Sequence, residues 1–145
     1  MIKIRFAVVG KIKESFYREA VAEYLKRLSR FAEVSVVEVA ECRTLEEEGI
    51  LLQRQIRGSA FVLAIEGQKL SSEAFAKKIK SYLDRGREIT FVIGSSYGLA
   101  PSVKASADES ISFSDMTFPH QLMRVILAEQ LYRAFMINTG SEYHK

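Results

Sequence analysis

The chain has 145 residues, of which 48% are apolar and 27% are charged. This size and composition are typical of a soluble, globular, single-domain protein with its own hydrophobic core, so we expect one domain over residues 1–145. The net charge of +3 (21 basic and 18 acidic residues) and the pI near 9.0 are too mild to indicate nucleic-acid binding. No apolar run is long enough to cross a bilayer, and the single cysteine, Cys42, excludes an internal disulfide. A cytoplasmic protein without a metal cluster is therefore expected.

Strand-like and helical patterns alternate along the chain. In chain order we predict a strand at Ile2–Val9, a helix with an apolar stripe from Tyr17 to Phe31, a strand at Val34–Val39, a helix at Leu45–Arg57, a strand at Ala60–Ile65, a helix capped near Ser71 and running to Asp84, a strand at Ile89–Ile93, a short helix from Pro101, a strand at Ser110–Phe113 and a long helix from Pro119. This alternation predicts an α/β fold with a mostly parallel sheet flanked by helices.

The last helix has an unusual distribution of polar residues. At a hundred degrees per residue, one side of its first turns carries His120, Gln121 and Arg124. The later turns carry Glu129, Gln130 and Arg133 on roughly the opposite side. A helix that packs only on its own sheet would keep one polar stripe throughout. We therefore predict a homodimer, with a deeply buried helix of a monomer as the alternative.

Three loops are expected at the carboxyl ends of strands. They are Glu66–Leu70, Gly94–Gly98 and Phe113–Phe118. Ligands of open α/β sheets bind at this edge, and glycine permits a close approach of the backbone. Any one of these loops could be a plain turn, but together they could enclose one small molecule. The segment Gly10–Lys13 is not a Walker loop, because it lacks the glycine spacing and the Lys-Ser/Thr ending.

The loop Gly94–Gly98 reads GSSYG, which also matches the nucleophile elbow G-x-S-x-G of α/β-hydrolases. A hydrolase triad would comprise Ser96 as nucleophile, Asp108 or Asp115 as acid, and His120 or His144 as base. The chain is short for that fold, and no HGGG-like oxyanion segment precedes the loop. The two histidines are otherwise ambiguous. His120 could be a core histidine or a functional one, while His144, near the end of the chain, is expected to have little structural duty.

Several segments carry a family resemblance: IKIRFAVVGKIK, EYLKR, LSSE, FVIG, FSDMTFPHQLMRVILAEQLYRAF and YHK. Together they resemble the ribosomal RNA large-subunit methyltransferase H family, a group of small SPOUT-class methyltransferases. The resemblance spans essentially the whole chain, and its last two segments are the most specific.

The resemblance implies a single-domain SPOUT fold with a C-terminal trefoil knot and a homodimer. It also implies an S-adenosylmethionine-dependent enzyme that methylates N3 of a pseudouridine in 23S rRNA within the assembled ribosome, without metal, membrane or DNA. The positions that match the family's cofactor-binding segments are Leu63, Gly94, Phe113, Ser114, Asp115, Met116, Thr117 and Phe118. The positions that match its catalytic tail are Tyr143, His144 and Lys145.

The chain departs from the family pattern at two places. The family's strand end usually reads Gly-Gly-x-x-Gly, whereas Ser95 stands at the second glycine here, which could crowd the cofactor. The region between Val39 and Ala60 is also shorter than in many relatives, which should trim a surface helix.

Methyl transfer from a sulfonium is an in-line displacement, and N3 of the base must lose its imide proton. His144 is the candidate base, Tyr143 a candidate stacking partner for the nucleotide, and the candidate electrostatic helpers are Arg124, Arg133 and Lys145. A small serine hydrolase and a non-catalytic RNA-binding protein remain the alternatives.

Overall fold

The computed structural model describes residues 1–144, in which strands and helices alternate as predicted. The elements are β1 (Lys3–Val9), α1 (Ser15–Leu28), β2 (Glu33–Val39), α2 (Leu45–Arg54), β3 (Ser59–Lys69), α3 (Ser72–Asp84), β4 (Ile89–Ile93), α4 (Pro101–Ser106), β5 (Glu109–Ser112) and α5 (His120–Asn138). Two helix starts follow from capping side chains. The Thr44 hydroxyl accepts a hydrogen bond from the Glu47 N–H, and the Ser71 hydroxyl accepts one from the Ala74 N–H.

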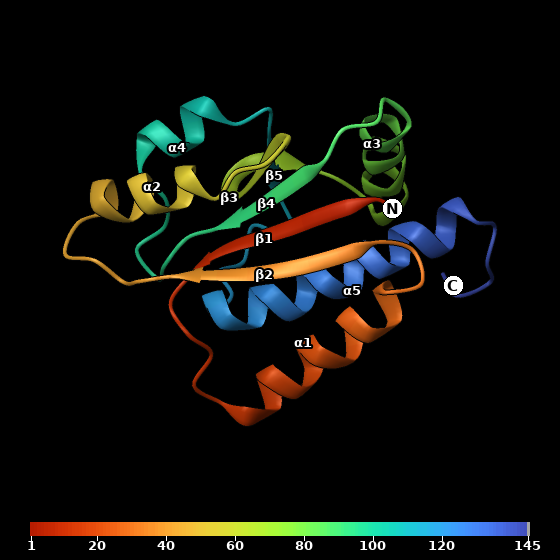
Figure 1. Cartoon of the computed structure of the whole chain (residues 1–145), viewed down its shortest axis with the longest axis horizontal. Helices are drawn as coiled ribbons and strands as arrows, with labels where there is room; N and C mark the ends of the chain where they lie inside the picture. Colours follow the sequence, from red (N-terminus) through yellow and green to blue (C-terminus); the bar gives the residue numbers. More distant parts are fainter. Residues whose placement is uncertain (145) are drawn as a thin grey trace.

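The five strands form one sheet in the order β2-β1-β4-β3-β5, and every neighbouring pair is parallel. Side chains alternate between two cores along the central strand β1: Phe6 and Val8 belong to one, Ala7 and Val9 to the other. Helices α1, α3 and α5 bury their apolar residues in the first core, and α2 and α4 in the second. Figure 1 shows α2 and α4 on one side of the sheet and α1 and α5 on the other. The predicted α/β fold is confirmed.

Strand β3 is longer than predicted, because its second half was assigned to a loop. Its pairing with β5 is irregular, since Leu63 and Gln68 both lie opposite Ile111. At Gly67 a Cβ atom would lie 2.7 Å from the backbone nitrogen of Ile111. Only glycine therefore lets the chain return to β5 after the irregularity. The composition Glu-Gly-Gln resembles a turn, and long-range pairing overrides that local preference.

Part of the unusual polar pattern of helix α5 is explained by contacts within a single subunit. Arg124 is only 1% exposed and contacts the neighbouring strands, and Leu131 is fully buried in the core of its own chain. The polar position of Arg124 is therefore explained within one subunit, and the homodimer stays a prediction. A half-buried stripe remains at helical spacing, Leu122, Val125 and Ile126. Within residues 1–144, no helix is both long and apolar enough to cross a membrane.

Candidate active site

A cavity of about 790 Å³ opens at the carboxyl ends of β3, β4 and β5. Its walls come from residues 63–66 of β3, residues 93–99 at the end of β4 and after it, Lys104 of α4, residues 111–114 and 116–118 in and after β5, and the start of α5. The loops after β4 and β5 meet at this cavity as predicted, whereas the predicted loop Glu66–Leu70 contributes only Glu66 and mostly continues strand β3. A volume of this size lies within the range of small-molecule sites, and the position is the ligand edge of an open parallel sheet.

The loop Gly94–Gly98 closes on itself. The Gly98 N–H donates to the Ser95 carbonyl at 2.9 Å, and the Tyr97 N–H donates to the Ser95 hydroxyl at 3.3 Å. A Cβ atom at Gly94 would lie 2.1 Å from the Gly98 carbonyl oxygen, and Gly98 has a φ of 96°. The loop's own backbone therefore requires Gly94. The prediction that glycine also lets a ligand approach the backbone here stays a prediction.

The residues predicted to bind the cofactor lie together around the cavity, with one exception. The lining includes Leu63, Gly94, Phe113, Ser114, Met116, Thr117 and Phe118. Asp115 is the exception, because it is exposed and pairs with Lys69. The loop after β5 is held by Ser114, whose hydroxyl accepts a hydrogen bond from the Met116 N–H and whose carbonyl accepts one from the Ser112 hydroxyl.

His120 lies at the start of α5, in the wall of the cavity. Its Nε2 atom is buried and has no hydrogen-bond partner among the described residues. Burial lowers the pKa of His120, and the nearby charge of Arg124 lowers it further. The ring is therefore favoured in its neutral form. His120 is the histidine near the cavity, whereas His144 was the predicted base.

Arg124 lies one turn further along α5 and holds the helix to the end of β1. Its guanidinium donates to the Glu38 carboxylate at 2.9 Å and to the carbonyls of Val9 and Gly10 at 2.8 and 2.7 Å. Burial lowers the pKa of Arg124, and the Glu38 carboxylate opposes that shift. This structural role was missed in the sequence. The available signal was an arginine in an apolar helix, which needs a buried acceptor.

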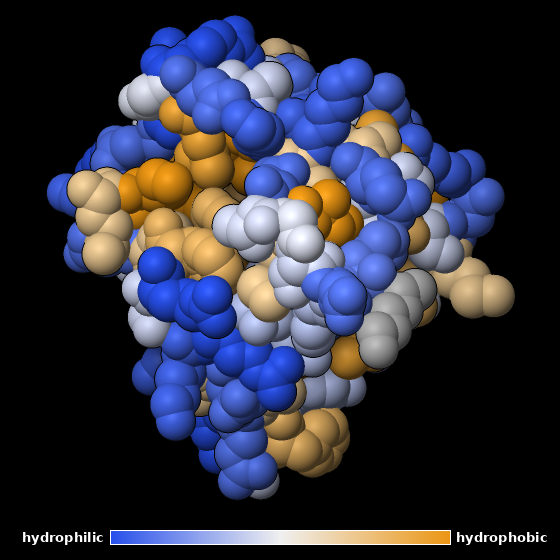
Figure 2. All heavy atoms as spheres, turned by 90° about the vertical axis from the view of Figure 1, so that its right-hand side faces the viewer, coloured by the Kyte–Doolittle hydropathy of each residue, from blue (hydrophilic) through white to orange (hydrophobic). Residues whose placement is uncertain are grey.

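The C-terminal tail packs against the last turns of α5 and the start of α3. The Tyr143 hydroxyl donates to Glu129 at 3.0 Å, and Arg133 pairs with the same carboxylate. The His144 ring lies between Arg133, at 3.0 Å from Nδ1, and Glu73, at 2.6 Å from Nε2. Figure 2 views the molecule from this end, where hydrophilic residues cover much of the surface and apolar residues are exposed between them. Lys145, the third predicted tail residue, lies outside the described residues.

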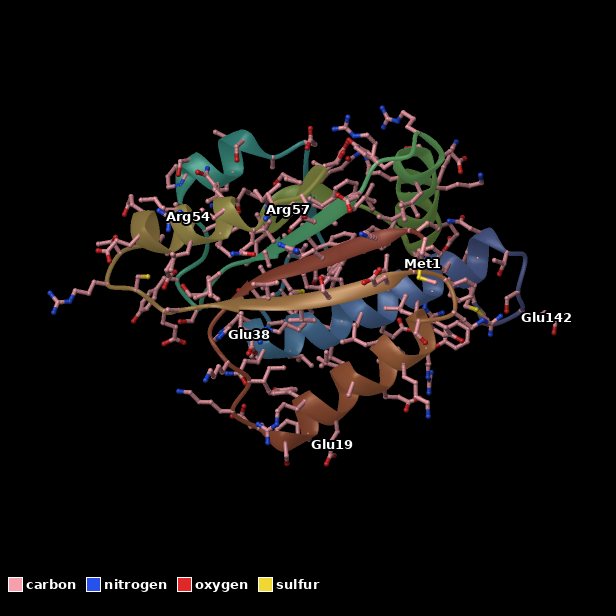
Figure 3. All side chains as sticks on the ribbon, viewed as in Figure 1. Met1, Glu19, Glu38, Arg54, Arg57 and Glu142 are labelled. Carbon is pink, nitrogen blue, oxygen red and sulfur yellow. The ribbon has the colours of Figure 1, made fainter. Side chains whose placement is uncertain are left out.

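The tail and the cavity lie at opposite ends of α5. Met123 lines the cavity, and Arg133 follows ten residues later on the same helix. At a rise of 1.5 Å per residue, these positions are about 15 Å apart along the helix axis. Figure 3 marks the two ends, with Glu38 beside the first turns of α5 and Glu142 in the tail beyond its last turn. Within one chain, Arg133, Tyr143 and His144 lie together but do not meet the predicted cofactor residues.

Comparison with known proteins identifies the family. The sequence matches the family described as "Predicted SPOUT methyltransferase" over residues 2–144.

This chain belongs to that family.

Full-length relatives carry the name "Ribosomal RNA large subunit methyltransferase H". Those from Levilactobacillus brevis, Bifidobacterium adolescentis and Lactobacillus helveticus are 50%, 48% and 46% identical, and each alignment covers 99% of this chain and 100% of the relative. These alignments span 159 positions against the 145 residues of this chain. That excess agrees with the predicted internal shortening, whose place between Val39 and Ala60 stays a prediction.

Two solved structures share the fold of this SPOUT-family chain. A probable methylase family protein from Haemophilus influenzae Rd KW20 has a TM-score of 0.60 at 11% identity, covering 98% of this chain and 70% of the other. A further methylase family protein, from Neisseria gonorrhoeae, has a TM-score of 0.57 at 10% identity, covering 89% and 81%. At such identities the likeness concerns the fold alone.

The hydrolase triad is not assembled in this SPOUT-family chain. Ser96 is exposed, and no hydrogen bond joins it to either histidine within residues 1–144. Asp108 instead accepts the Ala60 N–H at 2.8 Å, and Asp115 pairs with Lys69. In the described part of the chain no residue other than glycine has a positive φ, so the strained elbow of hydrolases is not formed.

Proposed function

We propose that this protein transfers a methyl group from S-adenosylmethionine to N3 of a pseudouridine in 23S rRNA of the assembled ribosome. The observation that carries the proposal is the cavity at the ends of β3, β4 and β5 in a chain of the SPOUT methyltransferase family. Relatives of full length named as methylating large-subunit rRNA support the choice of substrate. Action on the ribosome would place the protein in the cytoplasm. The trefoil knot stays a prediction.

The cavity fits a methyl donor of this kind. Its volume suits a nucleoside with an amino-acid tail, and apolar side chains such as Leu63, Ile93 and Phe113 supply surfaces for a flat ring. The first turn of α5 lines the same cavity and has no side-chain cap, so its free N–H groups favour an anionic group such as a carboxylate. When bound, S-adenosylmethionine would supply an electrophilic methyl group, held by Leu63, Gly94 and the loop Phe113–Phe118.

His144 is the proposed base that accepts the imide proton of the acceptor, but its docked position prevents this. An arginine only donates hydrogen bonds, so Arg133 requires an unprotonated Nδ1 on His144. The remaining nitrogen, Nε2, then carries the proton and donates a hydrogen bond to the Glu73 carboxylate at 2.6 Å. Both ring nitrogens are thus engaged. The tail must leave these partners before His144 can accept a proton from a nucleotide.

We further propose a homodimer in which the tail of one subunit completes the cavity of the other. Two α5 helices that run antiparallel across a twofold axis would place each tail next to the partner's cavity. The half-buried stripe Leu122, Val125 and Ile126 lies in the first half of α5 and offers an apolar contact for such pairing. This arrangement accounts for the separation of about 15 Å along the helix within one chain.

The activity is tested by calorimetry with S-adenosylmethionine and by transfer of a labelled methyl group. We expect saturable binding, and transfer to assembled ribosomes that lack the modification but little transfer to naked 23S rRNA. Mass spectrometry of the RNA should locate the label at N3 of a pseudouridine. Absence of donor binding would contradict the proposed function, and transfer to naked RNA alone would contradict its ribosomal context.

The dimer is tested with mixed subunits. One subunit carries Leu63→Trp, which fills the cavity, and the other lacks residues 143–145. Neither homodimer should transfer methyl groups, whereas the mixed dimer should recover activity at one site. An inactive mixed dimer of the correct mass would show that tail and cavity act within one subunit. A monomer by light scattering at micromolar concentration would contradict the dimer itself.

A further inference from the structure

We propose that Tyr97 is the side chain on which the target nucleobase stacks as it enters the cavity. Tyr97 lies in the loop Gly94–Gly98, lines the cavity and is 86% exposed. This inference rests on the proposed function and deepens it, because it names the residue that receives the RNA base.

Tyr97 has no partner within residues 1–144. Its ring takes part in no aromatic or cation-π pair, and its hydroxyl forms no hydrogen bond there. The other aromatic residues of the cavity wall, Phe113 and Phe118, are half-buried. An exposed aromatic ring that supports nothing in its own fold is available to a ligand.

Tyr143, the stacking residue predicted from sequence, is engaged elsewhere. Its hydroxyl is bonded to Glu129, its ring lies edge-on to Tyr132 at a centroid distance of 5.0 Å, and Arg133 lies 5.0 Å over it. In this arrangement no face of Tyr143 is presented to the cavity. Tyr97 is therefore the better candidate for the aromatic contact.

The turn that carries Tyr97 is held in place by its own backbone. An isolated bridge joins Ser95 to Gly98, and the Tyr97 N–H donates to the Ser95 hydroxyl. The close approach of Gly94 to the Gly98 carbonyl leaves this turn little room to change shape. A ring on a fixed turn loses less conformational entropy on binding than a ring on a mobile one, which favours stacking.

Two further exposed apolar side chains lie around the same opening. Met116, in the loop after β5, is 72% exposed, and Ile65, in β3, is 48% exposed. With Tyr97, they form an apolar rim contributed by three separate segments. The faces of a nucleobase are flat and uncharged, so such a rim matches them. The cavity wall also includes Lys104, which pairs with Glu66 and could instead meet a phosphate.

The occupant of this rim must be the acceptor rather than a permanently bound protein. Methyl transfer requires the attacking atom to lie about 3 to 3.5 Å from the methyl group, so the acceptor ring has to enter through the rim. A second subunit that covered Tyr97 would close this entrance. The dimer surface is accordingly expected on α5 and not at the rim.

The experiment compares Tyr97→Ala and Tyr97→Phe with the wild-type protein. The alanine variant should raise KM for ribosomes by about 5- to 150-fold, the loss of one base–aromatic stack. The phenylalanine variant should stay within about threefold of wild type, because stacking needs the ring and not the hydroxyl. Affinity for S-adenosylmethionine and the dimer mass should not change in either variant. Phe16→Ala is the matched control, since Phe16 is also exposed but lies outside the cavity.

A fluorescence measurement gives an independent readout. The chain contains no tryptophan, so Tyr97→Trp introduces a single reporter at the rim. Its emission should be quenched by assembled ribosomes that lack the modification, while a Phe16→Trp reporter should be quenched far less. Equal quenching of the two reporters would contradict a specific stack at position 97.

The possible results separate the two proposals. If the wild type neither binds the donor nor methylates ribosomes, the proposed function fails. If the wild type is active but Tyr97→Ala leaves KM for ribosomes unchanged, only the role of Tyr97 fails. A loss of donor affinity alone would assign Tyr97 to the donor, and a loss of the dimer would assign it to the subunit interface; either result overturns the stacking proposal.

Discussion

The two ends of α5 differ in how their polar groups are satisfied. At the N-terminal end, the His120 Nε2 has no hydrogen-bond partner among residues 1–144, the helix has no side-chain cap, and the exposed ring of Tyr97 lies at the cavity rim. At the C-terminal end, the tail forms a closed set of contacts in which Glu129, Arg133 and Glu73 engage Tyr143 and His144. Unsatisfied groups and exposed rings are costly unless a ligand completes them, whereas paired groups need none.

This difference indicates which end of α5 can bind a ligand as it stands and which end must rearrange first. The N-terminal end of α5 can bind a ligand in the described arrangement. The tail has to leave its partners. Burial and the hydrogen bond to Glu129 also raise the pKa of Tyr143 to about 12. The phenol therefore stays protonated at neutral pH and cannot act as a base while it is docked.

The largest expected effect is on stability, and it comes from removing the Arg124 contacts that hold the N-terminal end of α5. Arg124→Met should lower the free energy of unfolding by about 3 to 5 kcal/mol, because Glu38 and the carbonyls of Val9 and Gly10 lose their donor. Urea unfolding measures the change. Arg54→Met is the control, because the Arg54 side chain is exposed and forms no ion pair or hydrogen bond within residues 1–144, so this change should affect stability little. Equal stability of the two variants would show that the Arg124 contacts do not hold α5 in place.

Removing the C-terminal end should mainly affect catalysis. Deletion of residues 143–145 should lower the rate of methyl transfer to ribosomes at least about a hundredfold, through loss of the proposed base. Donor affinity by calorimetry should persist, since the cavity lies at the other end of α5. The half-buried Tyr143 predicts a small loss of stability as well. Glu142→Ala, in the same tail, should retain activity. A truncated enzyme with the wild-type rate would leave His120 as the remaining histidine candidate.

A smaller effect concerns the pH dependence of stability at the N-terminal end. The pKa of His120 is lowered in the folded state by burial, so the unfolded chain takes up a proton at a higher pH than the folded one. The free energy of unfolding should therefore fall as the pH drops below about 7 and passes toward the lowered pKa. In His120→Asn this fall should be shallower. The same slope in wild type and His120→Asn would contradict the inference.

The smallest expected effect concerns Ser95, which stands at a glycine of the family pattern. Ser95→Gly removes the hydroxyl that accepts the Tyr97 N–H at 3.3 Å, which is a long and exposed hydrogen bond. Donor affinity should stay within tenfold of wild type, a limit of about 1.4 kcal/mol. A larger loss by calorimetry would show that Ser95 contacts the donor. An unchanged KM for ribosomes would show that the hydrogen bond to the Ser95 hydroxyl is not needed for the Tyr97 ring to act.

Most of the fold could be predicted because the relevant signals are local. The apolar run of β1, the cap at Ser71 and the proline before α5 each act within a few residues, and the corresponding elements lie where we expected them. The main errors arose where contacts with distant segments determine the bounds of an element. The half of β3 beyond Ile65 is held by pairing with β5 rather than by its own composition, and α2 ends at Arg54 instead of Arg57. The Arg57 N–H is held by the Thr90 hydroxyl instead.

The predicted site was also recovered only in part. Strand-end loops predicted the place of the cavity, because parallel strands bring their carboxyl ends to one edge. The steric contact between Gly94 and the Gly98 carbonyl was not predicted, because it depends on the folded shape of the turn. Tyr97 was visible in the sequence only as one residue of a glycine turn. Its importance follows from its exposure at the opening of the cavity, which depends on three segments at once.

By itself, the sequence determined the α/β class, the order of the elements and the family, because periodicity, capping and motif residues are properties of neighbouring positions. The tertiary structure alone decided which distant groups meet: Arg124 with Glu38 and the end of β1, and His144 with Glu73. It also decided that the tail lies at the end of α5 remote from the cavity. Such pairings depend on the relative placement of whole helices and strands, which is set by the packing of the cores and leaves no trace in local spacing.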